Sequence, residues 1–180
     1  EIGTSLGTSR TRVREALKEL ESDGLVSQYP IEGTFVSDIT PYDVEEIFNL
    51  RIMLEICALQ VAYDKISEEE LNKVESKFVA LTLDSSKEAY HEADKSLHAL
   101  IVDKAGNSRL KQFLGILNVQ IERFRRMAAQ EPNRLTNSRI EHLEIINQLR
   151  RKDIKVCEES LKKHLDNVKK STLETAKYLY

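Results

Sequence analysis

Three histidines and one aspartate occupy positions that helical periodicity turns toward apolar faces. Asp94 and His98 are four residues apart in the run from Tyr90 to Ile101, so at about 100° per residue they share one face with apolar neighbours. His142 and His164 are centred in the same way on apolar stripes of two later helices. Burying a carboxylate is costly unless its charge is compensated. A divalent cation bound by these residues would supply that compensation.

This ligand set suits several metals and leaves three kinds of function open. One carboxylate and three imidazoles suit zinc first, with nickel, manganese or iron as alternatives that the spacing does not separate. Positions left open on an octahedral ion could take a small molecule. An open site could also activate water in an enzyme, with Glu55 or Glu141 as the general base. Alternatively, the metal could have a purely structural role and only hold three helices together. His91 lies about 60° from Asp94 around the helix and is expected at the surface or behind the ligands.

An arginine and a glutamate form a second buried-charge candidate earlier in the chain. Arg51 falls among Ile47, Leu54 and Ala58 on an apolar helix face, with Glu55 one turn further on. Either the two form an internal ion pair at i,i+4 spacing, or the planar guanidinium of Arg51 binds the carboxylate of a ligand. We therefore take both as candidate effector-binding residues.

Capping residues divide the later part of the chain into six helices. Thr40, Pro41 and Asp43 begin the first, and Ser67 with Glu70 forms a capping box for the second. Short connections between such helices predict antiparallel neighbours and an antiparallel six-helix bundle. The expected ranges are Pro41 to Lys65, Glu68 to Leu83, Lys87 to Ala105, Ser108 to Gln130, Arg134 to Arg151 and Ile154 to Tyr178.

The first forty residues predict a small DNA-binding fold. Ser9 is the expected N-cap of a helix that runs to about Ser22, and two short strands, 25–29 and 34–37, follow about a turn. This outline is typical of a winged helix-turn-helix, whose second helix enters the major groove. An ordinary solvated helix end is the alternative that periodicity leaves open. Hydroxyls and guanidiniums that suit phosphates and base edges lie at Thr8, Ser9, Arg10, Thr11, Arg12 and Arg14.

Composition places the chain among helix-rich globular proteins. It has 180 residues, of which 41% are hydrophobic and 32% charged, with six glycines and three prolines. A net charge of -3 argues neither for nor against a nucleic-acid partner. Cys57 and Cys157 lie in apolar patterns and are expected as reduced core residues of a cytoplasmic protein, and neither a signal peptide nor a membrane span is visible. Arg123, Arg125 and Arg126 are expected to form a solvated basic helix face, and a place in the pocket is the alternative.

Two resemblances cover nearly the whole chain, and the first concerns DNA binding. The run Ser9-Arg-Thr-Arg-Val-Arg-Glu-Ala-Leu17, followed by Gly-Leu-Val at 24–26 and a wing containing Gly33, resembles the signature of GntR-family transcriptional regulators. Gly33 joins the candidate DNA-binding residues on this basis. Arg12 stands where the family commonly has proline or threonine, and Glu32 where it has basic or small residues, which leaves the operator sequence open. The family's first helix would precede Glu1, so we expect a truncated domain.

The second resemblance concerns the helical remainder. The motifs Asp94-Lys-Ser-Leu-His98, Glu141-His142 and His164-Leu165 resemble the C-terminal FCD domain of the FadR-type branch of these regulators. The run from Arg51 to Glu55 matches the opening of that domain as well. The resemblance implies a metal on the aspartate and the three histidines, a carboxylate effector on the metal, and a homodimer. Leu97 stands where an aromatic residue is usual.

The sequence thus predicts a mostly α protein in two parts. A truncated winged helix-turn-helix occupies residues 1–37, a linker 38–43, and an antiparallel, FCD-like six-helix bundle 44–180. The expected function is that of a DNA-binding regulator and not an enzyme. A divalent metal and a small carboxylate would bind the bundle, change the relative placement of two DNA-binding domains in a homodimer, and so alter affinity for double-stranded operator DNA. No membrane partner is expected.

Overall fold

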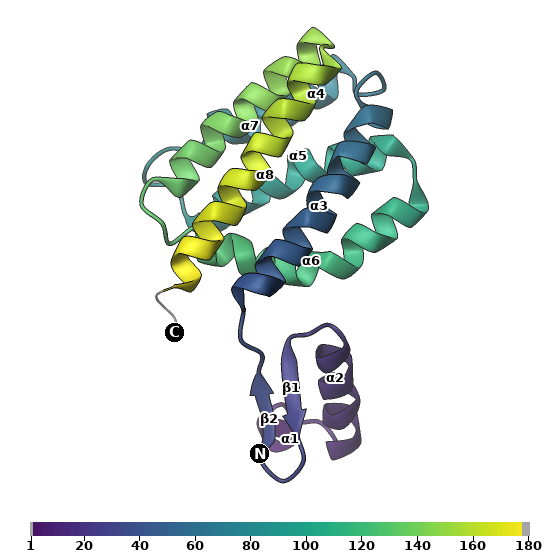
Figure 1. The fold of residues 1–180 in the computed structure, drawn as a ribbon, viewed down its shortest axis with the longest axis vertical. Coiled ribbons are helices and arrows are strands. Elements are labelled where there is room, and N and C mark those ends of the chain that lie inside the picture. The colour runs from purple at the N-terminus through teal and green to yellow at the C-terminus, as the bar shows by residue number, and fades with distance from the viewer. Residues whose placement is uncertain (1, 178–180) are drawn as a thin grey trace. The chain divides into compact units, whose positions relative to one another are not determined.

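The chain folds into two compact units that we describe separately. The structure is a computed structural model that describes residues 2–177 (Figure 1). The units comprise Glu1–Ile39 and Thr40–Tyr180. Eight helices and one two-stranded sheet make up the regular structure of the described residues, as the predicted fold class requires. Within residues 2–177, no helix is both long and apolar enough to span a bilayer.

The first unit contains the predicted helix, turn and wing. Its elements are α1 (Ile2–Ser5), α2 (Arg10–Ser22), β1 (Val26–Tyr29) and β2 (Gly33–Val36). Ser9 caps α2 by accepting a hydrogen bond from the backbone N–H of Arg12 at 3.3 Å. The strands pair antiparallel with Tyr29 opposite Gly33. Positive φ angles of 81° at Ile31 and 115° at Gly33 close the turn at the wing tip.

One detail of this unit differs from the sequence-based expectation. The helical spacing of Val13, Ala16, Leu17 and Leu20 predicts a buried apolar stripe on α2, but no residue of α2 is buried. Val13, Leu17 and Leu20 are half-buried, and Ala16 is exposed. Among the described residues, the four-residue helix α1 and strand β1 are the elements packed on α2, and they cover its apolar face only in part.

Six helices form the second unit, and all six predicted starting residues are confirmed. The helices are α3 (Pro41–Ala62), α4 (Glu68–Val79), α5 (Lys87–Ala105), α6 (Ser108–Ala128), α7 (Arg134–Arg151) and α8 (Ile154–Ala176). Helices α3, α4 and α6 end two to four residues earlier than predicted. Starts are predictable because Ser, Thr, Asp and Asn caps mark them, whereas the ends of these three helices have no glycine. The predicted end at Tyr178 lies outside the described residues.

Helix α8 lies lengthwise against α3, α6 and α7, and α3 also packs against α5 (Figure 1). The core between them contains fully buried Leu59, Leu97 and Leu161. Cys157 belongs to this core as predicted, but the prediction for Cys57 is wrong because its side chain is exposed. Helix α3 is apolar around most of its circumference, so periodicity does not identify a single inward face.

The capping box of α4 is expected to contribute measurably to stability. The Ser67 hydroxyl accepts from the backbone N–H of Glu70 at 3.3 Å, and the Glu70 carboxylate accepts from the backbone N–H of Ser67 at 3.1 Å. Ser67→Ala should therefore lower the free energy of unfolding by about 1 kcal/mol in urea titrations. Ser76→Ala, on the exposed side of the same helix, should change it by less than about 0.5 kcal/mol. Equal effects of the two variants would contradict a role for the cap.

Candidate metal centre

The four predicted ligands come together in the interior of the helical unit. Asp94 and His98 are contributed by α5, His142 by α7 and His164 by α8. One potential ligand atom from each residue lies within 4.8 Å of the others. All four side chains are buried, and His164 is 0% exposed. Helical phase therefore predicted the correct set of inward-facing residues.

Each of the three histidine rings contacts an acceptor with its Nδ1 atom. His98 Nδ1 contacts the Glu55 carboxylate, and His164 Nδ1 lies 2.8 Å from Oε2 of Glu141. His142 Nδ1 lies 2.7 Å from the backbone carbonyl oxygen of Ser138. A carbonyl or carboxylate can only accept, so each Nδ1 donates its N–H. Each ring therefore carries a proton on Nδ1 and presents Nε2 on its other side.

The three Nε2 lone pairs converge on one carboxylate oxygen. Asp94 Oδ1 lies 3.2 Å from His142 Nε2, 3.8 Å from His98 Nε2 and 4.0 Å from His164 Nε2. Nε2 of His164 is buried and has no hydrogen-bond partner. Four acceptors that face one another repel unless a cation lies among them. The donor set and its tautomers thus fit a divalent metal with nitrogen and oxygen ligands.

Burial keeps the histidines ready to bind a metal. It lowers the pKa of His164 to about 3, and it also lowers the pKa of His98. Neutral imidazole is the form that coordinates metals, so both rings remain competent at neutral pH. Burial alone would raise the pKa of Asp94, but Arg125, His98 and His142 together outweigh this and hold the pKa well below its ordinary value. Asp94 is therefore ionised.

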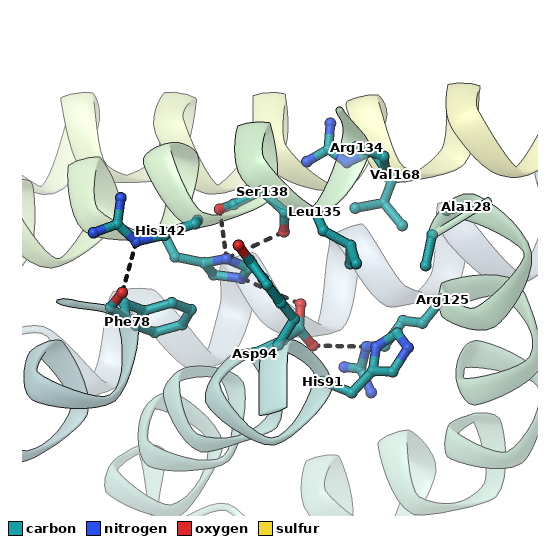
Figure 2. A pocket seen from close by; sticks show the side chains of 13 residues that line it. Phe78, His91, Asp94, Arg125, Ala128, Arg134, Leu135, Ser138, His142 and Val168 are labelled. Atoms are coloured by element: carbon teal, nitrogen blue, oxygen red, sulfur yellow. Dashed lines mark hydrogen bonds and ion pairs between the residues drawn. The ribbon is translucent and has the colours of Figure 1, made fainter. Parts of the chain in front are cut away.

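Arg125 corrects the expectation of a solvated basic run on α6. Its side chain is 10% exposed, and its Nε atom lies 2.7 Å from Oδ2 of Asp94 (Figure 2). Neither of these two buried atoms has a hydrogen bond of acceptable geometry, so the contact is an ion pair whose N–H is not aimed at the carboxylate. Arg126 is solvated as expected, at 65% exposed. Sequence alone did not separate the two neighbours.

Arg51 and Glu55 form the internal ion pair that was one of the two interpretations. Arg51 Nε donates to Glu55 Oε1 at 2.7 Å, and both residues are at most 3% exposed. Glu55 also accepts from His98, so it links Arg51 to the ligand cluster. Burial would raise the pKa of Glu55, but His98 and Arg51 together lower it. The Nη1 and Nη2 atoms of Arg51 are buried without hydrogen-bond partners.

A small chamber of about 30 Å³ opens beside the cluster (Figure 2). Asp94, His142, Arg125 and Arg134 contribute to its wall. His91 also lines it and is only 9% exposed, so a surface position for this residue is excluded. Burial lowers the pKa of His91 as well.

Sequence reasoning missed how His164 is held in place. Glu141 accepts from His164 Nδ1, from Asn167 Nδ2 at 2.8 Å and from the guanidinium of Arg134. Burial would raise the pKa of Glu141, but the hydrogen bonds from His164 and Arg134 lower it to about 2. The carboxylate is therefore ionised and orients the ring. Glu141 directly precedes His142, and that adjacency was the only signal in the sequence.

The candidate DNA-binding residues lie at the start of α2 and in the wing. Thr8 is half-buried, and the others are exposed. Together they present three guanidiniums at the positive end of a helix dipole, which suits phosphate. The exposed residues are the N-cap Ser9, then Arg10, Thr11, Arg12 and Arg14 on α2, and Gly33 in β2.

A winged helix-turn-helix joined to a helical domain with a buried polar cluster is the architecture of a one-component transcriptional regulator. Residues 1–36 match the gntR family of bacterial regulatory proteins, and residues 46–167 match the FCD domain. The chain belongs to the GntR family and carries an FCD domain, so it is a transcriptional regulator and not an enzyme. Such regulators bind operator DNA, and FCD domains bind small-molecule effectors.

Individual relatives agree with this assignment. A probable D-xylose utilization operon transcriptional repressor of Paenarthrobacter nicotinovorans is 30% identical over 92% of this chain and 74% of its own length. The uncharacterized HTH-type regulator YdhC of Bacillus subtilis is 28% identical over 93% of this chain and 76% of its own. The Zn²⁺-bound FCD domain of TM0439 superimposes with a TM-score of 0.69 at 26% identity, covering 80% of this chain and all of that domain.

Proposed function

We propose that Asp94, His98, His142 and His164 hold a divalent metal, zinc first, and that the metal-loaded domain binds a small carboxylate effector. The observation that carries the metal is the convergence of three Nε2 lone pairs on Asp94, with Nε2 of His164 buried and unpartnered. A zinc-bound relative of the same domain supports the choice of zinc. The metal would supply a Lewis-acidic positive charge that attracts an anion.

Unpartnered arginine donors support an anionic effector. Nη1 and Nη2 of Arg51 are buried without hydrogen-bond acceptors, and Nε of Arg125 meets Asp94 as an ion pair without a well-aimed hydrogen bond. A metal would occupy the acceptors His164 Nε2 and Asp94, but it would leave these donors unsatisfied. Buried donors without acceptors are costly, and a carboxylate matches the guanidinium fork. In this proposal Arg51 and Arg125 both attract the carboxylate, and Glu55 orients both Arg51 and His98.

We further propose that the regulator works in the cytoplasm as a homodimer whose two winged domains read two half-sites of an operator. Helix-turn-helix proteins usually bind paired half-sites through paired recognition helices, which supports the dimer. Effector binding in the helical domain would change the relative placement of the two DNA-binding domains. By linkage, operator DNA must change effector affinity by the same factor.

A gel-shift titration tests this function. The chain is loaded with zinc, titrated onto DNA from its own promoter region, and then challenged with short carboxylic acids. The expected result is sequence-selective binding whose midpoint moves about 5- to 150-fold with an active acid. Absence of selective binding would overturn the regulator mechanism. If zinc raises the melting temperature and no acid raises it further, the metal site has a purely structural role.

Removing a recognition-helix arginine should weaken DNA binding in a salt-dependent way. Arg12→Ala deletes an exposed guanidinium in the first turn of α2. If Arg12 contacts a phosphate, the slope of log K against log salt concentration should fall by about 1 in fluorescence anisotropy. Lys18→Ala, nearer the C-terminal end of the same helix, is the matched control and should leave the slope unchanged. A similar loss in both variants would contradict a contact specific to the helix start.

A further inference from the structure

A second, larger cavity adjoins the chamber beside the metal ligands. The inner chamber measures about 30 Å³ and the outer one about 270 Å³. The outer chamber lies between the segment that enters α5 and the segment that enters α7. The two cavities have four wall residues in common and are therefore direct neighbours. The shared residues are Tyr90, Ala129, Arg134 and Leu135.

The inner chamber is too small to hold a metabolite by itself. Its volume corresponds to about one or two water molecules, whereas ligand pockets usually measure about 300 to 1,000 Å³. The two cavities together reach the lower end of that range. An effector that places a carboxylate beside Asp94 and Arg125 therefore continues past Arg134 into the outer chamber.

The buried charges around the centre leave the charge of a metal uncompensated. The histidine rings add no negative charge to the centre, because each keeps its Nδ1 proton. A divalent cation would add two positive charges to a site in which each carboxylate already faces at least one cationic side chain. A single carboxylate would neutralise half of that excess, and a dianion would neutralise all of it. The existing pairs are Arg51 with Glu55, Arg125 with Asp94, Arg134 with Glu141 and, at the rim, Lys95 with Glu122.

The wall of the outer chamber suits an anionic or hydroxylated group. Lys87 and Arg134 bring cations to it, and Ser85, Asn133 and Thr136 bring neutral polar side chains. Asn133 makes no side-chain hydrogen bond to the first turn of α7, so the positive end of that helix faces the chamber without a side-chain cap. One acidic residue, Glu131, is also part of the wall.

We infer that the effector is an elongated dicarboxylate. One carboxylate occupies the inner chamber beside the metal ligands, and the second lies in the outer chamber near Lys87 and the start of α7. This inference rests on the proposed metal and effector site and narrows its ligand class. Two independent observations carry it, namely the size of the two neighbouring cavities and the fact that each carboxylate around the centre already faces a cationic side chain.

Calorimetry with matched acids tests the inference. Zinc-loaded protein is titrated with succinate and with butyrate, which have the same number of carbons but differ by one charge, and with glutarate and pentanoate as a second pair. Each dicarboxylate should bind at least about tenfold more tightly than its partner. Equal affinities within a pair would overturn the inference, while metal-dependent binding of butyrate would still uphold a carboxylate site. Zinc binding with no response to any of the four acids would overturn the effector proposal itself.

A charge variant locates the second carboxylate. Lys87→Gln should reduce the ratio of succinate to butyrate affinity by about threefold or more, because it removes a cation from the outer wall. Lys162→Gln makes the same change on the exposed side of α8 and should preserve the ratio. An unchanged ratio in Lys87→Gln would show that the outer chamber does not hold the second carboxylate.

Discussion

Replacing His164 with alanine should abolish stoichiometric zinc binding. His164 is 0% exposed, and its unpartnered Nε2 lies 4.0 Å from Asp94 Oδ1, so no other side chain replaces it without repacking. Metal analysis after dialysis should give one zinc per chain for the parent protein and close to none for the variant. At a free zinc concentration of about 100 times the dissociation constant, the parent should gain about 2.7 kcal/mol of stability that the variant lacks.

His91→Ala is the matched control for that experiment. His91 is also a buried histidine of α5 and lines the chamber, but it is not part of the four-residue cluster. This variant should keep one zinc per chain and most of the stabilisation by zinc. Loss of zinc in both variants would point to a general effect of packing, and full stoichiometry in His164→Ala would contradict the centre as assigned.

The inward orientation of the four clustered residues could be predicted because it depends on helical phase. A period of 3.6 residues places Asp94 and His98 on one face, and the same geometry centres His142 and His164 on apolar stripes of their helices. Inward orientation on three helices of one bundle was enough to bring the four residues together. Helix starts were equally accessible, because Ser67 and its counterparts mark them chemically.

The groups that support the ligands could not be predicted, because they depend on how helices pack. Glu55 and His98 are separated by 43 residues and meet only because α3 packs beside α5. The acceptor behind His142 is the backbone carbonyl of Ser138, which no residue type identifies. Arg125 and Arg126 are adjacent in sequence, and only the orientation of α6 in the bundle directs Arg125 toward Asp94.

Glu55→Ala should be among the most destabilising single changes in the helical domain. The variant would leave Arg51, which is 1% exposed, without its carboxylate, and His98 Nδ1 without its acceptor. Removing one partner of a buried pair typically costs about 3 to 5 kcal/mol, because an uncompensated charge remains. The free energy of unfolding of metal-free protein, measured in urea, checks this expectation without any contribution from zinc. Glu45→Ala, which removes a partly exposed partner of Lys169, should cost less than about 1 kcal/mol.

The double variant Arg51→Met, Glu55→Leu separates two explanations of that loss. If the cost in Glu55→Ala comes from the unpaired guanidinium, removing both charges should restore much of the stability, since apolar residues of similar size often replace a buried ion pair without loss. If the pair is instead needed to orient His98, the double variant should be stable but bind zinc about 10- to 100-fold more weakly, as loss of groups behind metal ligands typically does. Both results together are expected here, because Glu55 contacts Arg51 and His98 at once. A double variant as unstable as Glu55→Ala would contradict the charge argument, and unchanged zinc affinity would remove Glu55 from the support of the centre.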